Sequence, residues 1–281
     1  MKVLITGAAG LLGSEFVRAY HARGDVVVAC DRARLDVTDA ERVGDLMREE
    51  TPDVVLHCAA YTAVDRAERD GECAFSVNED GTRNVADAAA SIGARFVYFS
   101  TDYVFDGQTD EPYTPDSLPN PLSVYGRSKV AGEGATQASG ADWLIVRTGW
   151  LFGRGGSNFV STVLRRAREG LPTRVVDDQR GRPTWATNLA EHTIELLDLG
   201  TLGIVHVANS GTATWFELAE AALRIQKLKL DVTPVSTQVW GAVAERPRYS
   251  VLDIAASEAR LSRVMTPWYD ALSTFLSKVG L

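Results

Sequence analysis

The chain has 281 residues and a formal net charge of −8 at pH 7, with 45% hydrophobic and 23% charged residues. This size and composition are typical of a globular protein with one large domain, or with a large domain and a smaller lobe. The acidic balance argues against a general nucleic-acid binder, which is normally basic. No apolar run approaches the roughly 20 residues that a membrane helix needs. We therefore expect neither a nucleic-acid nor a membrane partner.

The three cysteines, Cys30, Cys58 and Cys73, have neither metal-ligand spacing nor a CxxC pair. An odd number of scattered thiols is most simply explained by a reducing compartment. The sequence therefore predicts a cytoplasmic location and no metal site.

Short β-rich runs alternate with helical patterns along the first half of the chain. We expect strands at residues 2–6, 26–31, 53–60, 95–101 and 142–148. We expect helices at residues 14–24, 39–50, 78–93 and 123–139. This alternation implies right-handed βαβ crossovers, and the continuous apolar strands indicate a sheet that is covered on both faces. The predicted fold class is α/β, with a Rossmann-type doubly wound parallel sheet.

The pattern is less regular after about residue 150. We expect helices at residues 157–170, 188–200 and 214–228, a loop at 173–186, and a further strand of the main sheet at 203–209. The sequence predicts a dinucleotide-binding domain made of residues 1–149 plus about 183–210. Residues of about 150–182 and 211–281 are expected to form a smaller, discontinuous substrate-binding lobe.

A glycine-rich loop lies between the first strand and the first helix. The stretch "LITGAAGLLGSE" contains Gly7, Gly10 and Gly13, with Leu11 and Leu12 between the last two glycines. Glycine permits a tight turn and a close approach of the backbone, so that N–H groups and the helix N-terminus can face a pyrophosphate. We predict that these five residues bind a dinucleotide cofactor. The alternative is a tight strand–helix packing without a ligand.

Charged residues follow the second strand, where the adenosine ribose of a dinucleotide is expected. Asp31 lies about 20 residues beyond the glycines, in place to bind the ribose hydroxyls. Arg32 and Arg34 follow it and could instead pair with a 2′-phosphate. NADPH and NADH therefore both remain open, and Asp36 and Val37 are placed to meet the adenine edge.

The third strand ends in the small residues of "CAAYT". Small side chains at this point leave room for a cofactor to lie over the sheet. We therefore add Ala59, Ala60 and Tyr61 to the predicted cofactor-binding residues.

Hydroxyl-bearing residues and a lysine follow the fourth strand. Thr101 ends this strand, where ligands of open α/β sheets bind, and is placed to hydrogen-bond a substrate oxygen; Ser100 beside it is predicted to contact the cofactor. Tyr125 and Lys129 are four residues apart on the next helix and so share a face. We expect the Lys129 ammonium to lower the Tyr125 pKa from about 10 and to bind the nicotinamide ribose. This set suits ketone reduction; the alternative is a half-buried tyrosine and a surface lysine.

Several longer stretches carry a resemblance to a known family. They include "GAAGLLGSE", "STDYVFDG", "NPLSVYGRSKVAGE", "DDQRGRPT" and "RPRYSVLD", and they span nearly the whole chain. The chain resembles the extended short-chain dehydrogenase/reductases and, within them, the dTDP-4-dehydrorhamnose reductases. The resemblance implies NAD(P)H-dependent reduction of the C4 keto group of dTDP-4-dehydro-L-rhamnose to dTDP-L-rhamnose. It implies that Tyr125 donates the proton, that Lys129 assists it, and that Thr101 tunes the substrate carbonyl.

The resemblance also implies roles for further residues. Asp102 would share in substrate binding, and Trp150 would pack on the sugar. Asn78 would support the active-site water and the helix geometry, and we also count it among the predicted cofactor-binding residues. Arg246 and Arg154 are candidates to meet the nucleotide diphosphate, because arginine suits bidentate phosphate contacts. We interpret Trp215, on a predicted helix, as a core residue.

A metal-bridged dimer is known in some members of this family. Glu15 matches the first of the acidic ligands, but Thr187 stands where a second is expected. Because a hard cation needs several oxygen ligands, with carboxylates the natural anchors, the sequence argues against a bound Mg²⁺. A homodimer without metal remains open.

Three other functions are consistent with parts of the pattern. A 4,6-dehydratase or epimerase would carry a glutamate after Thr101 and Asp102, but Tyr103 stands there. A reductase for another dTDP-4-keto-6-deoxysugar would share these motifs, since pocket shape sets the sugar. The third is a non-catalytic NADP-binding regulatory subunit, similar to that of methionine adenosyltransferase.

Overall fold

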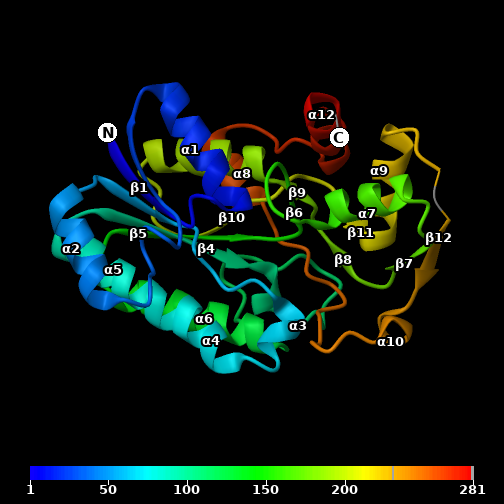
Figure 1. Cartoon of the computed structure of the whole chain (residues 1–281), viewed down its shortest axis with the longest axis horizontal. Helices are drawn as coiled ribbons and strands as arrows, with labels where there is room; N and C mark the ends of the chain where they lie inside the picture. The colour runs from blue at the N-terminus through cyan, green and yellow to red at the C-terminus, as the bar shows by residue number, and fades with distance from the viewer. Residues whose placement is uncertain (230, 280–281) are drawn as a thin grey trace.

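A six-stranded parallel sheet forms the centre of the computed structural model, which describes residues 1–229 and 231–279 (Figure 1). The strand order is β10-β5-β4-β3-β1-β2. The strands are β1 (Lys2–Thr6), β2 (Val26–Cys30), β3 (Val54–His57), β4 (Arg95–Thr101), β5 (Trp143–Thr148) and β10 (Gly203–His206). All neighbouring strands are parallel, which confirms the predicted sheet and its late sixth strand.

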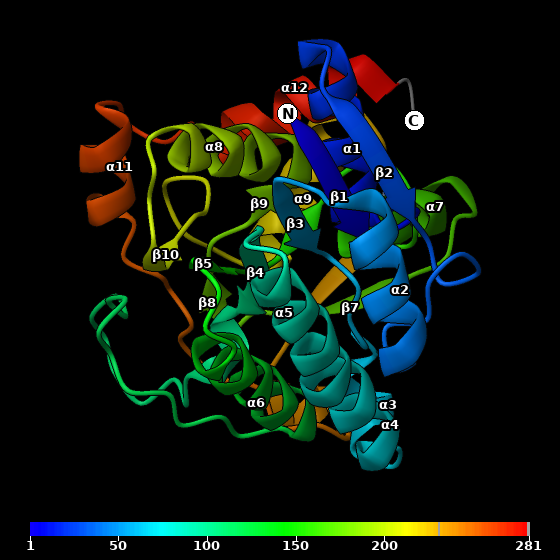
Figure 2. The ribbon, with the colours of Figure 1, turned by 90° about the vertical axis from the view of Figure 1, so that its left-hand side faces the viewer.

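Helices cover both faces of this sheet (Figure 1, Figure 2). One face carries α1 (Leu11–Arg23) and α8 (Ala186–Asp198), and the other carries α2 (Ala40–Glu50), α5 (Gly81–Ser91) and α6 (Val124–Ala138). Side chains of a strand alternate between the two faces. Accordingly, Val3 and Ile5 of β1 belong to the core under α1 and α8, and Leu4 belongs to the core under α2 and α5.

The helix ends follow from their capping residues. Helix α1 begins at Leu11, three residues earlier than expected, because Gly10 already serves as its N-cap, and it ends at Gly24 in the left-handed conformation (φ 79°). Asp39 caps the start of α2, since its carboxylate accepts a hydrogen bond from the Arg42 N–H at 3.0 Å.

Short helical elements lie between β3 and α5. They are α3 (Val64–Ala67), α4 (Gly71–Phe75) and a π-helical turn (Ser76–Asp80). We expected one regular helix from residue 78. The π-turn replaces its start and contains Asn78, which is 1% exposed and bonded to neighbouring elements. Such turns often occur at functional sites.

The smaller lobe is built from short strands and helices. Its strand pairs are β7 (Thr173–Val176) with β12 (Val232–Val235), β8 (Arg180–Gly181) with β11 (Ala213–Thr214), and β6 (Leu151–Phe152) with β9 (Thr184–Trp185). Its helices are α7 (Phe159–Arg168), α9 (Trp215–Ile225), α10 (Thr237–Trp240) and α12 (Trp268–Val279). The prediction of a loop over 173–186 is therefore wrong at three short strands. Each of these strands pairs with a segment that is remote in the sequence, and each is too short to show the alternation of apolar and polar residues that indicates a strand.

The lobe has a hydrophobic core of its own, separate from the cores on the two faces of the main sheet. Phe152, Leu218 and Phe275 belong to the core of the lobe, whereas Leu261 and Met265 pack into the core of the main sheet. Leu261 ends helix α11 (Ala255–Leu261), which lies against α8. The predicted domain boundaries stay a prediction. None of the described helices is both long and apolar enough to cross a bilayer.

Candidate active site

A cleft with a volume of ≈ 540 Å³ lies beyond the carboxyl ends of β1, β2 and β3. Nine of the predicted cofactor-binding residues line it: Gly7, Gly10, Asp31, Arg32, Asp36, Val37, Ala59, Ala60 and Tyr61. Strand β1 lies between β2 and β3, so the connection after β1 leads to one side of the sheet and the connection after β3 leads to the other. Ligands of doubly wound sheets bind at such a switch point.

The glycine loop leaves no space for side chains. Gly7 has a φ of 62°, and a Cβ there would lie 2.7 Å from the Ala59 nitrogen. A Cβ on Gly13 would collide with the Gly7 carbonyl oxygen. Among the described residues no side chain caps the start of α1 at Gly10. Free N–H groups at the N-terminus of a helix, next to glycines that let a ligand approach the backbone closely, fit the pyrophosphate of a dinucleotide.

The two candidate arginines at the ribose end lie differently. Arg34 is turned away from the cleft, since it donates to the Ala29 carbonyl at 3.1 Å and pairs with Glu50 at 3.2 Å. Arg32 lines the cleft and its side chain is 87% exposed, with Asp36 at 3.7 Å as a distant partner. Arg32 is therefore the cation that can reach a 2′-phosphate.

The cleft includes residues that sequence reasoning missed. They are Ala9, Leu35, Cys58, Arg66, Asp70, Cys73 and Val77. Ala9 and Cys58 adjoin predicted residues and could have been found by extending those motifs. Arg66, Asp70, Cys73 and Val77 belong to or adjoin short helical elements, and their place in the cleft depends on tertiary packing.

Asn78 connects the cofactor cleft to the catalytic helix. Its Oδ1 accepts from the Tyr61 N–H at 2.8 Å, and its Nδ2 donates to the Tyr61 carbonyl at 3.0 Å and to Ser128 Oγ at 2.9 Å. The amide thus joins the end of the cleft to α6, and its contact with a cofactor stays a prediction. Leu12 is buried in the core, and Leu11 packs against the same core at partial burial.

The predicted catalytic residues lie at the end of β4 and on α6. Ser123 caps α6 by accepting from the Gly126 N–H at 3.1 Å, and this start places Tyr125 in the first turn. Lys129, one turn later, is 2% exposed, and its Nζ lies 4.0 Å from the centroid of the Tyr98 ring. A cation over a ring face is favourable where water is excluded.

Thr101 and Asp102 form a buried polar pair beside these residues. The Thr101 hydroxyl donates to Asp102 Oδ1 at 3.1 Å and accepts from the Tyr103 N–H at 3.2 Å. The other Asp102 oxygen accepts from Ser250 Oγ at 2.5 Å. Ser100 is 4% exposed, and its hydroxyl has no hydrogen-bond partner among the described residues.

Burial dominates the protonation of these groups. It raises the pKa of Tyr125 to about 12, against the opposing effect of the Thr101 hydroxyl. It lowers the pKa of Lys129 to about 7, against the Glu133 carboxylate. It raises the pKa of Asp102 to about 6, although hydroxyl donors favour its charged form. The structure therefore departs from the expected lowering of the Tyr125 pKa, because loss of solvation disfavours the charged phenolate.

A second groove, with a volume of ≈ 210 Å³, lies between α3 and the lobe. It is lined by Asp65, Phe159, Arg174, Val175, Val176, Gln179, Trp215, Trp240 and Arg246. Aromatic walls with two arginines suit a nucleotide, whose base is flat and whose phosphates are anionic. Arg246 lines this groove, and its contact with a diphosphate stays a prediction; Arg154 is not among the lining residues, and its Nη2 donates to the Lys278 carbonyl at 3.3 Å.

The two tryptophans assigned from sequence are stacked on each other. The rings of Trp150 and Trp215 are 3.6 Å apart between centroids, at an angle of 2°. Trp150 is 8% exposed and belongs to the lobe core, whereas Trp215 also lines the groove. Contact of Trp150 with the sugar therefore stays a prediction, and Trp215 serves both the core and the groove.

Glu15 is engaged within the chain. It forms an ion pair with Arg18, and its Oε2 accepts from Thr187 Oγ1 at 3.0 Å. In the part of the chain that the structure describes, no group of three His, Cys, Asp or Glu side chains could hold a metal ion.

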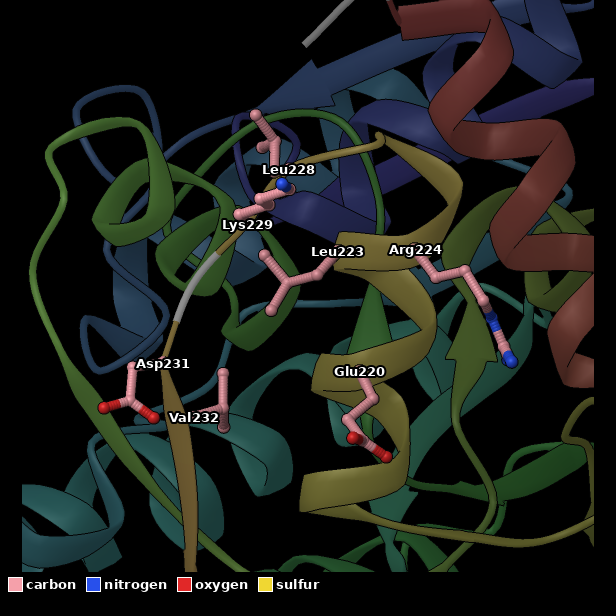
Figure 3. Close-up of a pocket in the computed structure, with 7 residues that line it drawn as sticks. All are labelled: Glu220, Leu223, Arg224, Leu228, Lys229, Asp231 and Val232. Carbon is pink, nitrogen blue, oxygen red and sulfur yellow. The ribbon is translucent and has the colours of Figure 1, made fainter.

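A further hollow, of ≈ 490 Å³, lies between α9 and β12 (Figure 3). Its lining consists of Glu220, Leu223, Arg224, Leu228, Lys229, Asp231 and Val232. Charges of both signs lie around it, and it contains none of the predicted site residues.

Comparison with known proteins agrees with the geometry. Residues 1–280 match the family described as "RmlD substrate binding domain". The dTDP-4-dehydrorhamnose reductase of Streptomyces griseus is 40% identical over 279 residues, which cover 96% of this chain and 91% of that protein. The dTDP-4-keto-6-deoxy-D-glucose reductase of Streptomyces niveus is 39% identical, covering 89% and 87% of the two chains.

A solved structure gives the same result. The crystal structure of dTDP-4-dehydrorhamnose reductase from Bacillus anthracis, in complex with NADP, superposes with a TM-score of 0.95. It is 38% identical and covers 99% of both chains. The chain therefore belongs to the RmlD substrate-binding-domain family, that of the dTDP-4-dehydrorhamnose reductases.

Proposed function

We propose that this protein uses NADPH or NADH to reduce the C4 keto group of dTDP-4-dehydro-L-rhamnose to dTDP-L-rhamnose. The observation that carries the proposal is the meeting of two features at neighbouring strand ends. The glycine-lined cleft lies beyond β1, β2 and β3, and Thr101 ends β4, the neighbour of β3, with Tyr125 and Lys129 on α6. Family membership supports the choice of a nucleotide sugar as substrate. We place the reaction in the cytoplasm, where the three free cysteines would stay reduced.

The residues of the cleft fit a dinucleotide, which would supply a hydride to C4 of the sugar when bound. The backbone around Gly7 and Gly10 would hold the pyrophosphate, and Asp31 would hold the adenosine ribose. Arg32 would meet the 2′-phosphate of NADPH.

The protein's own part in the reaction is to hold the carbonyl and supply a proton. With a pKa of about 12, the Tyr125 phenol is protonated at neutral pH, so it can donate to the developing C4 alkoxide. Lys129 would stabilise the phenolate that remains. The Tyr103 N–H donates to the Thr101 hydroxyl oxygen and so fixes its position, while the hydroxyl itself donates to Asp102. With substrate bound, the Thr101 hydroxyl would donate to the substrate carbonyl oxygen instead.

The nucleotide would lie in the groove of the lobe. Arg246 and Arg174 are the cations there, and Trp215 and Trp240 offer flat apolar surfaces to the base.

A second substrate is supported by one relative. The Streptomyces niveus protein is named as a reductase of dTDP-4-keto-6-deoxy-D-glucose at nearly the same identity. Reductases of different 4-keto sugars share the proton donor and differ in the shape of the pocket.

The test is a cofactor-oxidation assay with enzymatically generated dTDP-4-dehydro-L-rhamnose, with NADPH and NADH in parallel. We expect turnover by the wild type, and a loss of most activity in Tyr125→Phe with cofactor binding retained, because only the proton source is removed. Near wild-type turnover by Tyr125→Phe would contradict the mechanism. Turnover of other dTDP-4-keto-6-deoxysugars alone would move the proposal to the second substrate. Cofactor binding without turnover of any sugar would favour a regulatory subunit.

A further inference from the structure

Helix α3 and the residue that follows it lie where the parts of the proposed site meet. Figure 1 shows α3 between α6 and α10 of the lobe in this view. Ala67 is 0% exposed and anchors the segment in the protein. Asp65 lines the nucleotide groove, and Arg66 lines the cofactor cleft. Adjacent residues of one short helix thus face two different binding sites.

Asp65 holds Arg246 in a fixed orientation. Asp65 Oδ1 accepts from Arg246 Nη1 at 2.9 Å and from the Ala244 N–H at 3.0 Å, and Oδ2 accepts from Arg246 Nη2 at 2.8 Å. This bidentate pair fixes the plane of the guanidinium. Arg246 Nη1 also donates to the Ala244 carbonyl at 3.0 Å, and the Tyr103 hydroxyl is a further hydrogen-bonding neighbour of the guanidinium, which lines the groove.

Glu68 holds the start of the catalytic helix. Its Oε1 accepts from the Val124 N–H at 2.8 Å. Val124 is the first residue of α6, and Tyr125 is the second. The first N–H groups of a helix have no partner within it, and an anionic side chain at this end is also favoured by the helix dipole. Together with the Ser123 cap, Glu68 therefore holds the first turn of α6, which carries Tyr125.

We propose that Asp65 and Glu68 are positioning residues, Asp65 for binding of the sugar nucleotide and Glu68 for proton transfer. Asp65 orients Arg246 for the diphosphate of the sugar nucleotide, and Glu68 orients α6 so that Tyr125 reaches the sugar carbonyl. The inference rests on the proposed function, because it assigns the ligand of Arg246 from it. It predicts that neighbouring residues on one short segment affect different kinetic constants.

Asp65→Asn tests the first half. The amide replaces one carboxylate oxygen with an N–H group, which faces the guanidinium donors and loses the bidentate pair. Because charge-assisted bonds of this kind are lost, we expect the KM for the sugar nucleotide to rise about tenfold and the binding of dTDP to weaken by the same factor. We expect kcat and the Kd for NADPH to stay within about twofold. The Asp65 side chain is 48% exposed, so the variant should fold.

Glu68→Ala tests the second half. Removing the acceptor should lower kcat about tenfold and leave the KM for the sugar nucleotide unchanged, since Arg246 keeps its partner. Glu68→Gln keeps a carbonyl oxygen for the Val124 N–H and should recover most of the rate. Arg69→Ala is the matched control, because within the described residues the Arg69 side chain has no hydrogen bond or ion pair. All three constants should stay unchanged in it.

The outcomes separate this inference from the proposed function. An Asp65→Asn protein with unchanged KM and dTDP affinity refutes the role of Asp65 alone. Equal losses in all constants for both Asp65→Asn and Glu68→Ala, with lower thermal stability, mean that the segment only supports the fold, and they refute the inference. A wild-type protein that neither binds dTDP nor oxidises the cofactor refutes the proposed function, and the inference with it.

Discussion

The burial of Asp102 predicts how the free energy of unfolding changes with pH, in both sign and size. The side chain is 2% exposed, and burial raises its pKa from 3.8 to about 6 despite the hydroxyls of Thr101 and Ser250. We consider Asp102→Asn, which keeps the shape of the side chain but cannot titrate. Both hydroxyls can turn to meet the amide, so the variant should fold.

The sign follows from proton binding. Between pH 3.8 and about 6 the folded state of the wild type binds more protons at Asp102 than the unfolded state does. The free energy of unfolding must therefore fall as the pH rises through this range. Each pKa unit corresponds to 1.36 kcal/mol, so a shift of about 2 units gives a loss of about 3 kcal/mol, complete by about pH 7. Asp102→Asn lacks this loss.

Urea denaturation of both proteins between pH 4 and pH 7.5 measures the effect. All other carboxylates are shared, so their contributions cancel in the difference between the two proteins. The free energy of unfolding of Asp102→Asn, minus that of the wild type, should increase by about 2 kcal/mol from pH 4 to pH 7, because part of the full change already lies below pH 4. A difference that is constant, or that decreases with pH, would refute the reasoning that burial controls this carboxyl.

Three further predictions concern charged residues. Arg32→Ala should raise the KM for NADPH more than that for NADH, because only NADPH carries the 2′-phosphate; equal increases would count against this placement. Burial holds the pKa of Lys129 at about 7, so kcat/KM for reduction should fall as the pH rises through about 7. Lys129→Arg should move that fall to higher pH, and an unchanged pH profile would mean that another group causes the fall. Arg18 and Thr187 already occupy the Glu15 carboxylate, so sedimentation with Mg²⁺ or with EDTA should give one association state, and a change of mass on chelation would show a bridging metal.

The central sheet could be predicted because its strands carry their own signal. The ranges 2–6 and 95–101 match β1 and β4 residue for residue, since each is a β-rich run between clear breaks. The cofactor cleft was also predictable, because a dinucleotide needs glycines at defined places after the first strand. The strands of the lobe were missed where they are two to four residues long and pair with distant segments, as Thr173–Val176 does with Val232–Val235.

Residues that act through distant partners left no signal in the sequence. Asp65 on α3 and Glu68 just after it are ordinary acids in the sequence, and the roles proposed for them depend on Arg246 and Val124, which other parts of the chain bring to them. The pKa of Tyr125 was misjudged for a related reason. The spacing to Lys129 indicates that a cation is near, but the degree of burial that opposes its effect depends on the whole fold.

The raised pKa of Tyr125 is suited to the proposed direction of reaction. An enzyme that oxidises an alcohol needs a base, and a lowered tyrosine pKa provides one near neutrality. A reductase needs a donor, and a phenol whose pKa is held at about 12 is protonated in almost every molecule at pH 7. The C4 alkoxide that forms on hydride transfer is a stronger base than the phenolate, so the proton still moves to it. In the proposed mechanism Lys129 then stabilises the product of that step, the phenolate, and because burial lowers the pKa of Lys129 to about 7 we expect the rate to depend on pH through this group.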